Sequence, residues 1–202
     1  MNRFKNVLVA TNSTRQAAGN RLKRYWLAGP IAIIGLMFIL PAFAQDHEPL
    51  SFTLGPASDA ITKPSCLPNA TAKVTFFPKE EIRGVDTLDL KAEGLAPNTT
   101  FAVFLTELPV PPFGAVEYIG EFTTNTAGRG SMRVDAIIEE AFAFNNSTGV
   151  RKDLNHVVIW FADPNADEFC VPGSASTPFE GNGQAGIAVL SSKNAPPGAP
   201  LP

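Results

Sequence analysis

The chain has 202 residues, 45% of them hydrophobic and 17% charged, with 16 Lys or Arg against 19 Asp or Glu. The net charge of −3 argues against nucleic acid as a partner, because nucleic-acid binding depends on a surplus of basic side chains. The length suits one domain with an adequate hydrophobic core.

The first 44 residues have the layout of a secretory signal. Six basic residues and no acidic residue are followed by an uncharged apolar run from Tyr25 to Ala44. The run ends in Ala42-Phe43-Ala44, with small residues at the positions that a signal peptidase reads, so we predict cleavage before Gln45. The alternative is an uncleaved signal anchor, since about twenty apolar residues can span a bilayer. In both cases the remainder faces outward, because the basic flank stays inside.

The predicted mature chain, residues 45–202, is strongly acidic. It carries ten Lys or Arg against nineteen Asp or Glu, a net charge of −9. Such a balance disfavours electrostatic docking on anionic lipid. We therefore expect no nucleic-acid partner and no stable membrane association once the signal is removed.

The mature chain begins with a lead-in over residues 45–67. Its one apolar alternation, from Leu50 to Leu54, predicts an edge strand. A firmer strand follows at residues 71–77. Pro78 ends it, because proline has no N–H to donate to a strand ladder.

Four alternating runs separated by turn residues predict an antiparallel meander. In each run one face is apolar and the other polar, the period of a half-buried strand. The first connection, residues 94–98, holds a glycine that tolerates positive φ and a proline whose φ is preset for a turn. The runs are Asp86–Glu93, Thr99–Thr106, Val116–Thr124 and Gly130–Ile138.

The turn Gly94-Leu95-Ala96-Pro97-Asn98-Thr99, followed shortly by a phenylalanine, resembles the corner of fibronectin type III and other immunoglobulin-like domains. The resemblance covers residues 87–106 and implies a β-sandwich, without carrying over any site residue. The chain departs from antibody-type domains, because Cys66 and Cys170 do not flank Trp160 with the spacing found there.

We therefore predict an all-β fold, an antiparallel immunoglobulin-like β-sandwich of about 7–8 strands over residues 68–191. A disulfide is expected between Cys66 and Cys170, because an even pair of cysteines in an exported chain is most simply oxidised. Free thiols or a redox pair are the alternatives, but no Cys-x-x-Cys occurs to lower a thiol pKa. Residues 192–202 hold four prolines and are predicted to form a disordered tail.

Other segments of the domain differ in character. Residues 108–115 hold three prolines and predict a stiff, extended loop. Its Val110 and Phe113 have no periodic reason to be buried, so we expect either a partner-binding site or a Phe113 that plugs the end of the sandwich. Residues 139–153 predict a helical turn or strand end and then a polar loop. Residues 156–161 are apolar on both faces, which predicts a central strand.

The mature chain offers little catalytic chemistry. Its two histidines, His47 and His156, are too few for a histidine-rich copper or zinc site. His156 could orient a serine nucleophile, but a partly buried strand histidine bonded to a backbone carbonyl is the favoured interpretation. Acidic pairs at residues 80–81 and 139–140 are neighbours in sequence, which favours a solvated charged surface over the separated carboxylates of a glycosidase.

One segment has the spacing of metal ligands. Asp163, Asn165 and Asp167 alternate as oxygen ligands do in the first half of a calcium-binding loop. The pattern is incomplete, because Glu168 stands where that loop needs glycine and Ser174 where it needs a bidentate glutamate. An acidic surface loop built of turn residues is the favoured interpretation, and a calcium site is the alternative. No other cofactor is expected.

The sequence thus predicts a non-catalytic β-sandwich protein, secreted, periplasmic or at the cell surface, that acts as a binding or structural module. Its partner would be an extracellular protein or a glycan. The alternatives are a secreted carboxylate-dependent hydrolase and a calcium-dependent binding module. Four sequons would accept glycans in a eukaryotic source and would be plain turn and loop residues in a bacterial one, at Asn69, Asn98, Asn145 and Asn146.

Overall fold

The computed structural model describes most of the chain that follows the predicted signal. The signal itself, its cleavage site before Gln45, His47 and the acidic pair at residues 80–81 lie outside the described residues. The described residues belong to the compact unit Ala44–Pro202. They are residues 48–79, 84–145, 147–178, 183–195 and 201.

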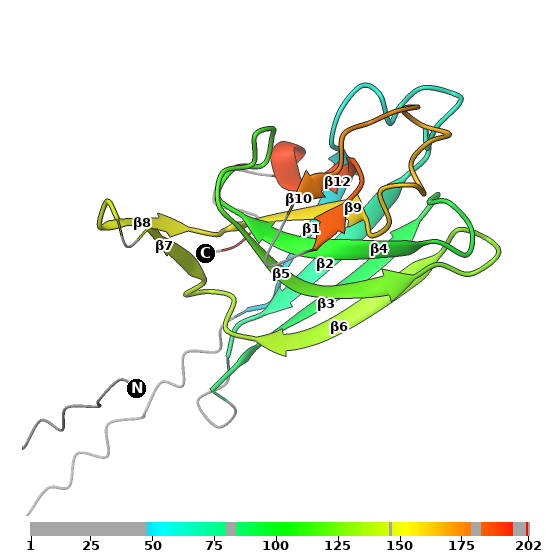
Figure 1. Ribbon diagram of the computed structural model, residues 1–202. Helices are drawn as coiled ribbons and strands as arrows, with labels where there is room; N and C mark the ends of the chain where they lie inside the picture. Colours follow the sequence, from blue (N-terminus) through cyan, green and yellow to red (C-terminus); the bar gives the residue numbers. More distant parts are fainter. Residues whose placement is uncertain (1–47, 80–83, 146, 179–182, 196–200, 202) are drawn as a thin grey trace, which may run out of the picture. The chain divides into compact units, whose positions relative to one another are not determined.

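The described part of the chain is built almost entirely of strands (Figure 1). The main sheet contains β1 (Leu50–Pro56), β2 (Thr71–Phe77), β3 (Asp86–Glu93), β4 (Thr100–Thr106), β5 (Val116–Thr123), β6 (Gly130–Ala136), β9 (His156–Phe161) and β12 (Ala188–Ser191). Two small hairpins are formed by β7 (Phe142–Asn145) with β8 (Val150–Asp153) and by β10 (Thr177–Pro178) with β11 (Gln184–Ala185). A 3-10 helix, η1 (Ser192–Asn194), follows β12.

The main sheet is antiparallel, with the strand order β5-β4-β9-β12-β1-β2-β3-β6. Its two edge strands, β5 and β6, follow each other in the chain and are in contact, so the sheet curves nearly into a barrel. The predicted all-β, antiparallel class is confirmed, and the eight strands agree with the predicted number. Because the strands form one continuous hydrogen-bonded series, the two-sheet immunoglobulin-like sandwich is not confirmed.

The first strand occupies the middle of the sheet and not its edge. Residues 50–54 of β1 pair with β2, and Gly55 and Pro56 pair with β12. Phe52 and Leu54 are buried on the inner face. The prediction of an edge strand was wrong because a short alternation in a polar lead-in does not reveal that the last strand of the chain returns to pair with it.

The predicted meander is also corrected, since only its middle pair, β4 with β5, forms. β3 pairs with β2 and β6, whereas β4 pairs with β5 and β9. The turn after β3 has the predicted chemistry, with φ of 71° at Gly94 and 49° at Asn98. However, this turn buries Leu95 and Ala96 in the core, and the next strand, β4, does not pair with β3.

The central strand was predicted correctly. β9 lies between β4 and β12, and its side chains are buried on both faces. On one face Val157, Ile159 and Phe161 join the main core that the curved sheet encloses. On the other face Val158 and Trp160 join a second, smaller apolar cluster, which is covered by loops.

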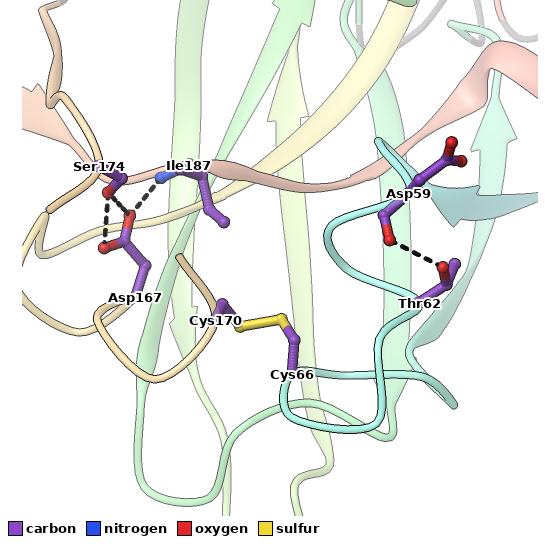
Figure 2. Close-up of a disulfide and its surroundings, with 7 residues drawn as sticks. All are labelled: Asp59, Thr62, Cys66, Asp167, Cys170, Ser174 and Ile187. Carbon is purple, nitrogen blue, oxygen red and sulfur yellow. Dashed lines mark hydrogen bonds between the residues drawn. A yellow bond between two sulfur atoms is a disulfide. The ribbon is translucent and has the colours of Figure 1, made fainter. Parts of the chain in front are cut away.

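The predicted disulfide between Cys66 and Cys170 is confirmed. It joins the loop between β1 and β2 to the loop after β9, with Cα atoms 4.4 Å apart (Figure 2). The bridge spans 104 residues of sequence. The bridge therefore links two loops directly to each other, in addition to their connections to the strands of the sheet.

Part of the segment predicted to be a disordered tail is structured. Ser192–Asn194 form η1, and the Ser191 hydroxyl caps this helix by accepting the Lys193 N–H. Ser192 and Leu201 are buried, Leu201 against the main core. Structure therefore continues past residue 192, where the high proline content predicted disorder, while residues 196–200 and 202 lie outside the described part.

Candidate functional site

The outer face of β1, β2, β3 and β6 presents the polar half of each strand alternation to solvent. Inward residues such as Ala72, Val74 and Leu90 are buried in the main core. Their outward neighbours are mostly exposed and polar. Strand periodicity therefore turns an ordinary amphipathic sequence into a wide polar surface.

The register aligns four outward residues in one row across this face. Thr53 lies opposite Lys73, Lys73 opposite Lys91, and Lys91 opposite Ser131. Side chains directly opposite each other in an antiparallel pair have Cβ atoms about 4.5–5.5 Å apart. The side chains of Lys73 and Lys91 thus extend from neighbouring positions at the middle of the row.

An open hollow of about 610 Å³ lies over this row. Arg129, from the turn between β5 and β6, also lines it. Asn125 Oδ1 accepts the backbone N–H of Ala127 and of Arg129, at 2.9 and 3.0 Å, and so fixes the shape of that turn. We call the space lined by Thr53, Thr71, Lys73, Lys91, Arg129 and Ser131 the cationic hollow.

The charge in the cationic hollow is largely uncompensated. Its one acidic lining residue, Glu93, lies with a carboxylate oxygen 4.0 Å from Arg129 Nε, and both side chains are exposed. Within the described residues neither Lys73 nor Lys91 forms an ion pair. An exposed site of this kind can hold an anionic group between two ammonium groups.

Several cations elsewhere in the described part of the chain are paired with acidic side chains. Arg133, one row away on the same face, lies 3.5 Å from Asp89. Lys79 donates to Glu140 at 3.0 Å, and this hydrogen bond raises the pKa of Lys79. Lys152 donates to Glu107 at 2.7 Å, and this hydrogen bond, with the N–H of Ala115, lowers the pKa of Glu107. Lys63 and Lys193 form no ion pair among the described residues either, so the feature that sets Lys73 and Lys91 apart is the register that places them opposite each other.

The three residues of the predicted calcium loop do not share one environment. Asp163 and Asn165 are exposed, and Asp163 Oδ1 accepts the backbone and side-chain N–H groups of Asn165 at 2.8 and 3.0 Å. Asp167 is buried, and Figure 2 shows its carboxylate beside Ser174 and Ile187. Both of its carboxylate oxygens accept the Ser174 hydroxyl, at 2.9 and 3.0 Å, and one also accepts the Ile187 N–H at 2.7 Å. Asp167 thus anchors the loop internally.

The predicted partner-binding loop is divided between surface and core. Val110 is exposed, whereas Phe113 is buried in the second apolar cluster with its ring centroid 4.8 Å from that of Trp160. The Ser191 hydroxyl donates to the Pro109 carbonyl and ties the loop to β12. Of the two alternatives, the buried one therefore holds: Phe113 packs into an apolar cluster and is not an exposed recognition residue.

His156 contacts a serine, but the pair is a packing contact between two elements. Its Nδ1 lies 3.3 Å from Ser192 Oγ, and that oxygen also accepts the N–H of Val157 at 3.3 Å. The predicted partner was a backbone carbonyl, so the prediction is corrected to the hydroxyl of η1. Burial lowers the pKa of His156 and so favours the neutral ring. A neutral ring can accept a hydrogen bond from the Ser192 hydroxyl at Nδ1. Ser192 is itself buried.

A second buried carboxylate is also structural. Asp86 accepts three backbone N–H groups, from Lys79 at 2.8 Å, Ile138 at 2.7 Å and Glu139 at 2.8 Å. It therefore joins the end of β2 to the segment after β6. Glu139 contributes its backbone N–H to this contact, and the carboxylate of Glu140 accepts from Lys79. The two acids remain neighbours and are not the separated pair of a glycosidase.

No protein-family model matches the chain, no curated protein is significantly similar to it in sequence, and no solved structure is significantly similar to it in fold. Among the described residues no helix is long and apolar enough to cross a bilayer.

Sequence reasoning missed the cationic hollow. Lys73 and Lys91 each occupy the polar position of an ordinary alternation, and 18 residues of sequence separate them. Only the pairing of β2 with β3 and its register place them opposite each other. The sequence did carry one signal: two consecutive predicted strands each have a lysine on the polar face, in an otherwise acidic chain.

Proposed function

We propose that the protein is a secreted, non-catalytic binding module whose cationic hollow binds an acidic glycan. The observation that carries the proposal is the cross-strand pair Lys73 and Lys91, which has no ion-pair partner among the described residues. Like charges directly opposite each other destabilise a sheet. An anionic ligand between the two ammonium groups would remove that repulsion.

The lining of the hollow favours a glycan over an acidic peptide. Hydroxyl groups of Thr53, Thr71 and Ser131 surround the two lysines. A hydroxyl is both donor and acceptor, which suits the hydroxyl groups of a sugar, while ammonium groups suit its carboxylates. The hollow is broad and open and has no deep apolar pocket to take a peptide side chain.

Three further features support an exported binding module. A disulfide is typical of oxidising compartments. Residues 45–202 carry a net charge of −9, so most of the surface repels anions. An anionic ligand would therefore be directed to the cationic hollow. The two buried carboxylates, Asp86 and Asp167, are occupied by hydrogen bonds that hold loops in place, which argues for structure over acid–base chemistry.

Titration calorimetry with polygalacturonate at low salt tests the proposal. The mature protein should bind and should lose affinity as salt rises. Lys73→Thr and Lys91→Thr should each weaken binding about fivefold, for a charge–charge contribution of about 1 kcal/mol in water. The matched control is Lys63→Thr, which removes the same charge from an exposed loop and should bind as the wild type does.

Three outcomes would overturn the proposal. Absence of binding to polygalacturonate at low salt would remove the glycan function. Binding of polyglutamate in preference to polygalacturonate would show that the ligand is an acidic peptide. Neutral dextran serves as the reference, and its binding with equal affinity would show that the lysines are not the determinants.

A further inference from the structure

The hairpin of β7 and β8 is largely exposed, although Ala143 is half-buried against the main core. All four residues of β8 and three of the four in β7 are exposed, with Phe142, Phe144 and Val150 among them at 47%, 52% and 43%. Figure 1 shows this hairpin as a separate pair of strands beside the main sheet. An isolated two-stranded hairpin is at best marginally stable in water. Exposed aromatic side chains on such an element indicate a surface that another molecule covers.

The two edges of this hairpin differ in a way that identifies the one open to pairing. β8 carries Arg151, Lys152 and Asp153 in sequence, and charges on an edge strand oppose pairing with another strand. Lys152 is also bound to Glu107, at 2.7 Å. β7 has the uncharged sequence Phe-Ala-Phe-Asn and pairs with no strand of the described chain except β8. β7 is therefore the unprotected edge.

Backbone hydrogen bonds show which groups of β7 are available. The carbonyl of Asn145 accepts the Gly149 N–H at 2.8 Å, and the carbonyl of Ala141 accepts the Leu154 N–H at 3.0 Å, so both point toward β8. The direction of these groups alternates along a strand. The N–H and C=O groups of Phe142 and Phe144 consequently point toward the open edge, where they can form four hydrogen bonds with an identical strand.

The side chains of β7 are self-complementary about Ala143. An antiparallel copy related by a two-fold axis there would set Phe142 opposite Phe144 of the second copy, and the reverse. Within the hairpin, Phe142 lies opposite Asp153 and Phe144 opposite Arg151. Each row across the four strands would then run from an acid, through two aromatic rings, to a base. Cross-strand aromatic pairs stabilise a sheet, and no like charges would meet.

We propose that a second copy of this chain pairs with β7 along this edge, antiparallel about Ala143, to form a homodimer with the sheet β8-β7-β7-β8. The inference is independent of the cationic hollow, which lies on other strands. The contact is small, so the dimer is weak and forms in the micromolar range or above.

Sedimentation velocity over a concentration series tests the dimer. The wild-type mass should rise from one chain toward two, Phe144→Lys should stay monomeric, and Val150→Lys, which adds the same charge to β8, should dimerise as the wild type does. A wild type that stays monomeric at high micromolar concentration overturns the proposal. Equal dimerisation of Phe144→Lys and Val150→Lys also overturns it.

A cross-link tests the register without relying on a loss of binding. Ala143 would face Ala143 of the second copy as a non-hydrogen-bonded pair, with Cα atoms about 4.5 Å apart, within the range of about 4.4–6.8 Å for disulfides. Ala143→Cys should therefore form a covalent dimer in a glutathione buffer. The control is Ser147→Cys, exposed in the hairpin turn, which should form much less. Equal cross-linking of the two variants contradicts the proposed register.

Discussion

Individual buried polar side chains hold the loops of this fold in place. The carboxylate of Asp86 accepts three backbone N–H groups, and that of Asp167 accepts one backbone N–H and the Ser174 hydroxyl. A buried carboxylate is costly unless it is hydrogen-bonded, so each of these acids commits its segment to one conformation. Asp167, one of the three residues with calcium-ligand spacing, therefore holds its own loop in place in this structure.

The first prediction concerns Phe113. Phe113→Ser should lower the free energy of unfolding by about 3 kcal/mol, because it empties a buried site beside Trp160. Val110→Ser, in the same loop but 42% exposed, should change it by less than about 0.5 kcal/mol. Urea unfolding followed by tryptophan fluorescence measures both. A Phe113→Ser variant as stable as the wild type would show that the ring is not part of the core.

The second prediction concerns the pH dependence that His156 causes. Burial lowers the pKa of His156 below its ordinary value of 6.5, so the unfolded state binds the proton more readily than the folded state. The contribution of His156 to the free energy of unfolding is therefore fully present above pH 6.5, and it is lost as pH falls through the pKa of the folded state. His156→Gln should show a smaller drop in urea midpoint between pH 7 and pH 5.5. An unchanged drop would mean that other groups cause it.

At this scale the sequence revealed residue types but not their partners. The pairing of Cys66 with Cys170 was predictable because no other cysteine exists. The partner of His156 was not predictable, since Ser192 belongs to a segment whose prolines indicated disorder. Likewise, Phe113 could be assigned to core or surface only after Trp160 was found beneath it.

Among the elements, the pair β2 and β3 combines a structural cost with the proposed binding site. Lys73 and Lys91 lie opposite each other in the register, and the like charges repel. A pair that is unfavourable for folding is most simply retained because it binds something. The sheet would be more stable with a neutral side chain at one of the two positions.

The third prediction follows from this repulsion. Lys91→Thr should raise the free energy of unfolding by about 0.2–1 kcal/mol at low salt, while it weakens binding of polygalacturonate. The gain should shrink as salt screens the charges. Chemical denaturation at low and high salt measures both. A loss of stability at low salt would show that the two lysines do not repel in the folded protein.

The fourth prediction concerns the disulfide. The double variant Cys66→Ala, Cys170→Ala should lose about 2–5 kcal/mol, because the bridge closes a long loop of the unfolded chain. It should keep its binding of polygalacturonate in the folded state, because neither cysteine lines the cationic hollow. Calorimetric unfolding and the binding titration check the two parts. Loss of binding in a variant that is still folded would contradict the separation of stability from function.

Strands were predicted well from sequence, and their pairing was not. Alternation placed β2 and β3 at their observed bounds. The order of strands depends on contacts between distant segments, so the return of β12 to β1 and the crossing after β3 were invisible. The exposed hairpin of β7 and β8 was predicted as a helical turn or strand end followed by a polar loop, because strands of four residues carry almost no period.

For the molecule as a whole, curvature of the sheet separates an apolar interior from a polar exterior and brings the ends of the sheet together. β5 and β6 meet, and the turn between them supplies Arg129 to the row of Lys73 and Lys91. The cationic hollow therefore exists only in the folded, nearly closed sheet. Its position in an acidic protein makes it the strongest candidate for the site of function.

The central claim is that this hollow is where an anionic glycan binds. Heteronuclear NMR titration of the mature protein with an oligogalacturonate tests it directly, because backbone amide signals report the location of the ligand. We predict the largest shifts at Thr53, Lys73, Lys91 and Ser131, with loss of these shifts in Lys91→Thr. Shifts confined to other strands, or none at low salt, would contradict the account.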